Sequence, residues 1–249
     1  MIYNPICQES EVSMAAVYIG SARHDENGNL NGKEGDQLQT GSGNDFKGEV
    51  SMQEYYAHKL GWNGLRFKDV AFRHKIAERM VAASNNANIG YSQIGRGKIL
   101  KDGINSKKKT NCDCSTLLRE AFKEATGIDP GNFTSADART VLLATGLVES
   151  FQVKGADCMI GDILITKKKG HCAVVVIGKN PNGVESYYPK YVGATTSIVS
   201  ALAYVGEKDT SMNHRKKIAL ANGISNYQGT IKQNLQLVSL IKLGKLKKA

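Results

Sequence analysis

Apolar positions that recur every three or four residues predict helices in several parts of this chain. The spacing is helical over residues 67–87, 114–126 and 135–144, and again over 198–205, 215–221 and 230–243. The stretch 114–126 gives the clearest signal, because one of its faces is apolar and Gly127 follows it as a C-terminal stop. The apolar face consists of Leu117, Leu118, Ala121, Phe122 and Ala125.

The period changes to that of β-strands after the third helix. Residues 162–166 and 172–177 are short apolar runs, and a turn over 178–183 leads into an alternating stretch at 184–188. Residues 17–62 are typical of extended loop with one or two short strands, and 89–111 of a polar connection. Helices followed by an antiparallel meander predict an α+β fold with helices packed on an antiparallel sheet. We expect this domain to span residues 1–195 and a small helical module to span 196–249.

Length and hydropathy narrow the class of protein. The chain has 249 residues, enough for a medium domain and a small one. No run approaches the roughly 18 apolar residues that a membrane-spanning helix needs. The first ten residues lack the basic and apolar segments of a secretory signal. We therefore expect synthesis in the cytoplasm, and release by another route if the protein acts outside it.

The net charge of +10 favours a polyanionic partner, such as nucleic acid, a membrane surface or an anionic cell wall. No finger spacing and no aromatic-basic strand motif points to nucleic acid. Solvated surface lysines are the alternative interpretation of the charge. The basic residues form short clusters at 107–109, 167–169, 215–217 and 242–248.

The five cysteines have three possible uses: buried apolar residue, metal ligand or nucleophile. Their odd number, in a chain of this length without a visible signal, argues against a disulfide framework. A zinc site would draw on Cys112, Cys114, Cys158, His171 and Cys172. The pairs at 112/114 and 171/172 are closer than the usual spacing of zinc ligands, so we expect no metal and no other cofactor.

Cys114 stands at the predicted start of a helix, after a loop rich in glycine and lysine. The free N–H groups and the dipole of a helix start stabilise a thiolate, which makes the sulfur nucleophilic at neutral pH. The same N–H groups can hold the oxyanion of a tetrahedral intermediate. A buried apolar cysteine is the structural alternative.

A thiolate nucleophile needs an imidazole partner, and the chain has five histidines. His171 begins the predicted strand at 172–177, where a histidine is held rigidly and can face a helix start. His74 lies among charged residues of a helix and is expected at the surface. His24, His58 and His214 lie in polar surroundings without a strand or a nucleophile nearby in the sequence.

The order Asp113-Cys114-Ser115, Gly161-Asp162 and Gly170-His171 resembles the NlpC-type and CHAP cysteine hydrolases of bacterial cell walls. A phage-lysin branch of that group is the most similar, and the resemblance covers about residues 17–180. It rests also on the segments Ile19-Gly20-Ser21-Ala22-Arg23-His24-Asp25-Glu26-Asn27-Gly28, Gly35-Asp36-Gln37, Gly48-Glu49-Val50, Ile89-Gly90-Tyr91-Ser92-Gln93 and Asn132-Phe133-Thr134.

The resemblance implies a papain-like domain in which Cys114 is the nucleophile and His171 the general base. Tyr91 matches a tyrosine that lines the active site, and Gln93, Asp113 and Ser115 are expected near the substrate. The residue that orients the imidazole usually lies on the strand after the histidine. Glu185 is the first candidate for this position, ahead of Asn180 and Asn182. Tyr91 as a core residue and Glu185 as an outward-facing strand residue are the structural alternatives.

Two departures from the family pattern are Cys112, which precedes the Asp-Cys-Ser motif, and Cys172, which follows the histidine. Both make oxidation of the site feasible without removing the cysteine and histidine.

The resemblance implies a phage endolysin-like hydrolase that cuts an amide bond in the peptide stem of bacterial peptidoglycan. An endopeptidase and an N-acetylmuramoyl-L-alanine amidase remain equal alternatives for the bond. Two other functions stay open, namely a non-catalytic wall-binding protein that keeps the fold and a cysteine hydrolase acting on a different amide. The module at 196–249 is expected either to pack on the domain or to bind anionic wall polymers.

Overall fold

The computed structural model describes residues 17–24, 27–38, 45–181, 187–224 and 226–248. A six-stranded antiparallel sheet with strand order β2-β1-β8-β7-β3-β6 forms its centre. The strands are β1 (Tyr18–Ala22), β2 (Val50–Glu54), β3 (Trp62–Phe67), β6 (Val148–Phe151), β7 (Ile163–Thr166) and β8 (Cys172–Ile177). Strands from both ends of the domain sequence therefore meet at β1 and β8, the pair that holds the candidate site.

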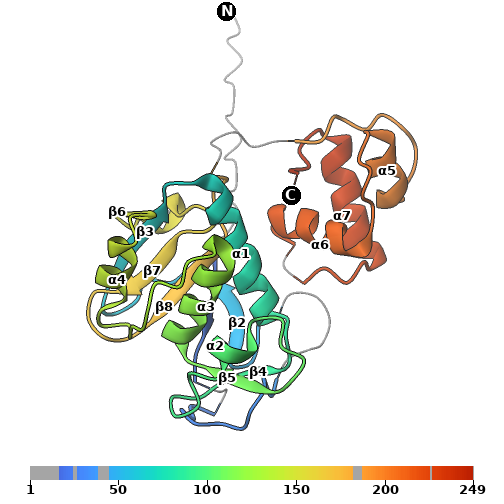
Figure 1. Cartoon of the computed structure of the whole chain (residues 1–249). Coiled ribbons are helices and arrows are strands. Elements are labelled where there is room, and N and C mark those ends of the chain that lie inside the picture. The colour runs from blue at the N-terminus through green and yellow to red at the C-terminus, as the bar shows by residue number, and fades with distance from the viewer. Residues whose placement is uncertain (1–16, 25–26, 39–44, 182–186, 225, 249) are drawn as a thin grey trace, which may run out of the picture.

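Two long helices, α1 (Val70–Ser84) and α3 (Cys114–Thr126), cover one face of this sheet (Figure 1). Asp69 begins α1 by accepting a hydrogen bond from the Ala71 N–H, and Gly127 ends α3 in the left-handed region at a φ of 78°. The main core lies between sheet and helices and contains Phe67, Met80, Leu117, Phe122 and Val174. A smaller apolar cluster, around Trp62 and Val175, lies on the other face.

The segment between α1 and α3 has more structure than the polar connection that the sequence predicts. A two-stranded parallel sheet joins β4 (Ile89–Tyr91) to β5 (Thr110–Cys112), and the short helix α2 (Ile99–Asp102) lies between them. Because β5 leads directly into α3, this small sheet fixes the position at which α3 begins.

The domain is completed by α4 (Ala138–Ala144) and the single 3₁₀ turn η1 (Gly155–Asp157). Strands β3 and β6 are absent from the sequence prediction. Asn63, Gly64 and Arg66 interrupt the apolar pattern of β3, and β6 is only four residues long. The strand predicted at 184–188 falls mostly on residues outside the described part of the chain. Tyr187, which is described, makes an isolated β-bridge with Lys247.

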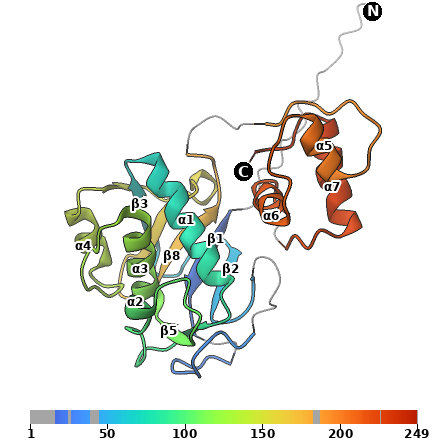
Figure 2. The same cartoon turned by 45° about the vertical axis from the view of Figure 1, so that its right-hand side comes forward.

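The remaining helices, α5 (Ile198–Tyr204), α6 (Met212–Ala221) and α7 (Ile231–Lys242), surround a separate apolar cluster (Figure 2). Tyr188 and Tyr191 belong to this cluster, so its packing begins before residue 196. Leu220 of α6 packs against the main core, and Lys217 lies 3.9 Å from Glu78 of α1.

The described part of the chain thus has seven α-helices and one antiparallel sheet of six strands, which confirms the predicted α+β class. None of these helices is long and apolar enough to cross a membrane.

Candidate active site

Cys114 is the first residue of α3, and the sequence around it explains why the helix begins there. The Asp113 carboxylate accepts hydrogen bonds from the Thr116 N–H at 2.7 Å and from the Thr116 hydroxyl at 2.9 Å, while that hydroxyl accepts one from the Asp113 N–H. This reciprocal cap satisfies the N–H of Thr116. The N–H groups of Cys114 and Ser115 precede it and have no acceptor within the helix. They are therefore available to a ligand beside the Cys114 sulfur.

The environments of the four described cysteines differ, and only that of Cys114 favours a thiolate. Hydrogen bonding to the Cys172 side chain, together with hydrogen bonding to His171 and its charge, lowers the pKa of Cys114 to about 5, although burial and Asp113 oppose the shift. Burial raises the pKa of Cys158 to about 12 and that of Cys112 well above its ordinary value. Cys114 is thus the described cysteine suited to nucleophilic attack.

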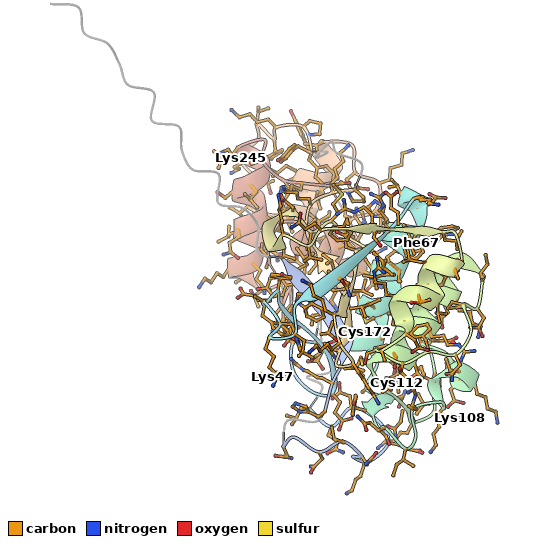
Figure 3. The ribbon with its side chains drawn as sticks, turned by 90° about the vertical axis from the view of Figure 1, so that its left-hand side faces the viewer. Lys47, Phe67, Lys108, Cys112, Cys172 and Lys245 are labelled. Atoms are coloured by element: carbon orange, nitrogen blue, oxygen red, sulfur yellow. The ribbon has the colours of Figure 1, made fainter. Side chains whose placement is uncertain are left out.

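Cys172 lies beside Cys114 as a thiol. Hydrogen bonding to Cys114 and burial raise the pKa of Cys172 well above its ordinary value, so its S–H remains in place as a donor to the Cys114 thiolate. Cys112 and Cys172, both labelled in Figure 3, belong to the core between sheet and helices. Cys158 belongs to the cluster on the opposite face.

His171 is held at the end of the β7–β8 hairpin by its backbone. Its N–H donates to the Thr166 hydroxyl at 2.8 Å, and its carbonyl accepts from the Thr166 N–H at 3.0 Å. The ring nitrogen Nε2 lies 3.1 Å from Ser21 Oγ on β1. The Trp62 ring lies beside the imidazole, with ring centroids 6.2 Å apart. Hydrogen bonding between the imidazole and Cys114 links His171 to the start of α3.

Tyr91, for which the resemblance implies a place in the active site, lies within electrostatic reach of Cys114 and Asp113. It is 7% exposed, its hydroxyl accepts a hydrogen bond from Gln93 Nε2 at 3.3 Å, and its N–H donates to Glu49 Oε2 at 2.7 Å. Burial raises the pKa of Tyr91, and the charges of Cys114 and Asp113 raise it further. A phenol that keeps its proton beside the thiolate can donate a hydrogen bond to a bound substrate.

Asp113 and Ser115, which were expected near the substrate, are buried and engaged within the protein. Besides capping α3, Asp113 accepts a hydrogen bond from the Ser115 hydroxyl at 3.1 Å and pairs with Arg96 at 3.1 Å. These bonds use both side chains to support the helix start. Gln93, in contrast, is exposed.

Of the three candidates for the residue that orients the imidazole, Asn180 alone lies within the described residues. Glu185 and Asn182 lie outside the described residues. Asn180 follows the far end of β8, at the opposite end of that strand from His171, and lines a hollow with His74 and Lys217. Within the described residues, the hydroxyl of Ser21, which is 150 positions away in the sequence, lies within hydrogen-bonding distance of the imidazole.

An aromatic group at the rim of the site also escaped the sequence prediction. The rings of Tyr56, His58 and Trp62 pack against one another, with centroid distances of 5.1 to 5.8 Å. Burial and the charge of His171 lower the pKa of His58. His58 therefore lies near His171 in space, although the two residues are far apart in the sequence. Stacked rings of this kind offer an apolar wall for a ligand.

The Gly161-Asp162 motif supports the fold. Asp162 is fully buried, and its carboxylate forms a two-point pair with Arg66 at 2.6 and 2.7 Å and accepts from the Met159 N–H at 2.7 Å. Gly161 has a φ of 83°, and an added Cβ would lie 2.2 Å from the Arg73 carbonyl oxygen. The motif thereby fixes the entry to β7, which carries the hairpin that presents His171.

Within the described residues, no group of three or more His, Cys, Asp or Glu side chains is arranged to hold a metal ion.

A comparison with protein-family models matches residues 19–182 to the model described as "endolysin-like domain". Neither the curated proteins nor the solved structures contain a match. The matched region begins in β1, ends after β8 and includes every residue of the site described above. The match extends over more than half of the chain, and the chain therefore belongs to the endolysin-like domain family.

Proposed function

We propose that this protein is a cysteine hydrolase that cuts an amide bond in the peptide stem of bacterial peptidoglycan, with Cys114 as nucleophile and His171 as base. Membership of the endolysin-like family supports a role at the peptidoglycan of a bacterial wall. The chemistry rests on one observation: a cysteine with its pKa lowered to about 5 lies at a helix start beside an imidazole. An NlpC-type or CHAP-type, papain-like mechanism belongs to this proposal.

In the first half of the reaction, the Cys114 thiolate attacks the carbonyl carbon of the scissile amide. The oxyanion that forms lies at the start of α3, where the N–H groups of Cys114 and Ser115 can donate to it. The protonated His171 then gives its proton to the amide nitrogen. The C–N bond breaks, an amine leaves, and the acyl group remains on sulfur as a thioester.

In the second half, neutral His171 takes a proton from water as the water attacks the thioester carbonyl. Collapse of this second tetrahedral intermediate releases the carboxylic acid and restores the thiolate and the imidazolium. No redox partner is required, because the sum of the two halves is hydrolysis of the amide.

We also propose that the helical module binds anionic wall polymers. Residues 196–249 contain nine Lys and Arg residues and two Asp and Glu residues, and so supply most of the net charge of +10. In the rest of the molecule the basic side chains are balanced by acidic ones. The labelled Lys47, Lys108 and Lys245 lie on separate parts of the surface in Figure 3. A dense positive charge outside the site would raise the local concentration of enzyme at a polyanion without altering the chemical step.

The function is tested by digesting purified peptidoglycan and identifying the new termini by mass spectrometry. The proposal predicts one new amino group for each new carboxyl group at a single type of stem bond. The position of that bond distinguishes an endopeptidase from a muramoyl-alanine amidase. If the protein binds the peptidoglycan but no new termini appear, the result would instead support a non-catalytic binding protein. Cleavage of proteins but not of peptidoglycan would support the hydrolase of another amide.

A further inference from the structure

A hydroxyl on β1 lies within hydrogen-bonding distance of the His171 imidazole. Ser21 Oγ lies 3.1 Å from Nε2, and the Ser21 side chain is only 2% exposed. Since an imidazole has two nitrogens, the bond at Nε2 leaves Nδ1 for the Cys114 sulfur.

Strand pairing explains why Ser21 reaches this position. β1 runs antiparallel to β8, with Gly20 paired to Val174, so the next residue, Ser21, lies beside Ala173. His171 lies two residues before Ala173, immediately before β8, and its ring meets the Ser21 hydroxyl at this end of the two strands. The contact therefore joins β1 to the residue that leads into β8.

We propose that Ser21 is the positioning residue for His171: its hydroxyl accepts the hydrogen bond from Nε2–H and directs Nδ1 toward Cys114. This inference rests on the proposed function, because it assigns a role within the same nucleophile–base pair. The family resemblance implies an orienting residue on the strand after the histidine, whereas this proposal gives that role to the neutral hydroxyl of Ser21 on β1.

The chemistry of a hydroxyl suits this position. During the reaction the imidazole alternates between a protonated form, with both N–H groups, and a neutral form that must keep its proton on Nε2. Ser21 can accept from Nε2–H in both forms, so the ring keeps its orientation through the whole cycle. Without the acceptor, the neutral ring is free to place its proton on Nδ1, where it cannot act as base toward water or thiol.

Ser51 provides a matched control. It is paired directly with Ser21 across β1 and β2 and is 1% exposed. Its hydroxyl donates to the Gly48 carbonyl oxygen at 3.2 Å and accepts from Arg23 at 2.7 Å. Ser51→Ala thus removes a buried hydroxyl from the neighbouring strand without removing a bond to His171.

The test compares Ser21→Ala, Ser21→Thr and Ser51→Ala in the full-length protein. For hydrolysis of a soluble stem peptide, Ser21→Ala should lower kcat by roughly 10- to 100-fold with little change in KM, as expected for a misplaced catalytic group. The acid limb of its pH–rate profile should move to higher pH, because a displaced imidazole no longer helps to hold the pKa of Cys114 low. Ser21→Thr keeps an Oγ and should restore most of kcat, whereas Ser51→Ala should stay close to the wild type.

A second readout does not depend on the substrate. The rate of Cys114 alkylation by iodoacetamide against pH follows the thiolate, and Cys114→Ser gives the background. Ser21→Ala should move the midpoint of this profile to higher pH, because a displaced imidazole loses its hydrogen bond to the Cys114 sulfur. Unchanged alkylation and kcat in Ser21→Ala, or equal losses in Ser21→Ala and Ser51→Ala, would overturn the role of Ser21. If instead the wild type alkylates as described but cleaves no peptidoglycan, the proposed function fails while the positioning role stands.

Discussion

Replacing Cys172 by alanine removes the S–H donor next to the nucleophile while leaving His171 in place. Hydrogen bonding to Cys172 is the largest influence that lowers the pKa of Cys114. Cys172→Ala should therefore raise that pKa. Cys172→Ser is the matched control, since its hydroxyl can donate to the thiolate from the same position.

The size of the effect follows from the energy of a hydrogen bond to a charged group. Such a bond contributes about 1.5–3 kcal/mol, which corresponds to a rise in the pKa of Cys114 from about 5 to about 6 or 7. The thiolate population at pH 6 would then fall roughly two- to tenfold, whereas at pH 8 it would change by less than about twofold. The loss of activity is thus confined to acidic conditions.

The assay is the rate of stem-peptide hydrolysis between pH 4 and pH 9 for the wild type, Cys172→Ala and Cys172→Ser, with melting temperatures as a check on folding. The acid limb should move to higher pH in Cys172→Ala and stay near the wild type in Cys172→Ser. If the acid limbs of the wild type and Cys172→Ala coincide in folded proteins, the thiol at position 172 does not stabilise the thiolate.

Three further predictions concern stability and wall binding. Asp162→Ala leaves Arg66 without its buried partner and should lower the free energy of unfolding by about 3–5 kcal/mol in urea titrations. Asp129→Ala breaks an exposed pair with Arg119 and should cost less than about 1 kcal/mol; similar losses in the two variants would argue against the structural role of Asp162. Burial raises the pKa of Asp36 from 3.8 to about 6, so its ionisation costs stability as the pH rises through that window, and Asp36→Asn should flatten this part of the stability profile. If Asp36→Asn leaves the profile of melting temperature against pH unaltered, the raised pKa of Asp36 is not the cause of this pH dependence. Binding to cell walls, measured as salt-sensitive sedimentation, should weaken when the exposed Lys208, Lys232 and Lys245 are changed to Gln. The control variant carries the same change at the exposed Lys107, Lys108 and Lys109 and should lose less binding. Melting temperature and cleavage of a soluble peptide should stay unchanged in both variants. Equal weakening by both triple variants would assign binding to total charge and not to the module.

Local signals in the sequence were sufficient to predict α3. Its apolar period and the stop at Gly127 agree, and the helix spans the predicted residues 114–126. The strand predicted at 172–177 also has the predicted bounds, because a β-branched run follows a glycine-containing turn. The nucleophile and the histidine were named from these two elements and a family resemblance.

Features that depend on tertiary contacts could not be predicted in this way. Strands β3, β4 and β5 contain too few apolar positions to show a period, and they form because neighbouring strands supply their hydrogen bonds. The contact between Ser21 and His171 joins residues 150 positions apart, and only the register of β1 on β8 brings them together. The segment around Ser21 carries part of the family resemblance, but its sequence specifies no partner for the Ser21 hydroxyl.

The central claim is that Cys114 is the nucleophile, and the most direct measurement is the rate at which Cys114→Ser releases new termini from purified peptidoglycan. Cys158→Ala is the matched control, because Cys158 is also buried but lies on the opposite face of the sheet with its pKa raised to about 12. The account predicts that Cys114→Ser keeps the fold and retains less than about 1% of the wild-type rate, while Cys158→Ala retains most of it. A folded Cys114→Ser protein that retained more than about a tenth of the wild-type rate would contradict the thioester mechanism.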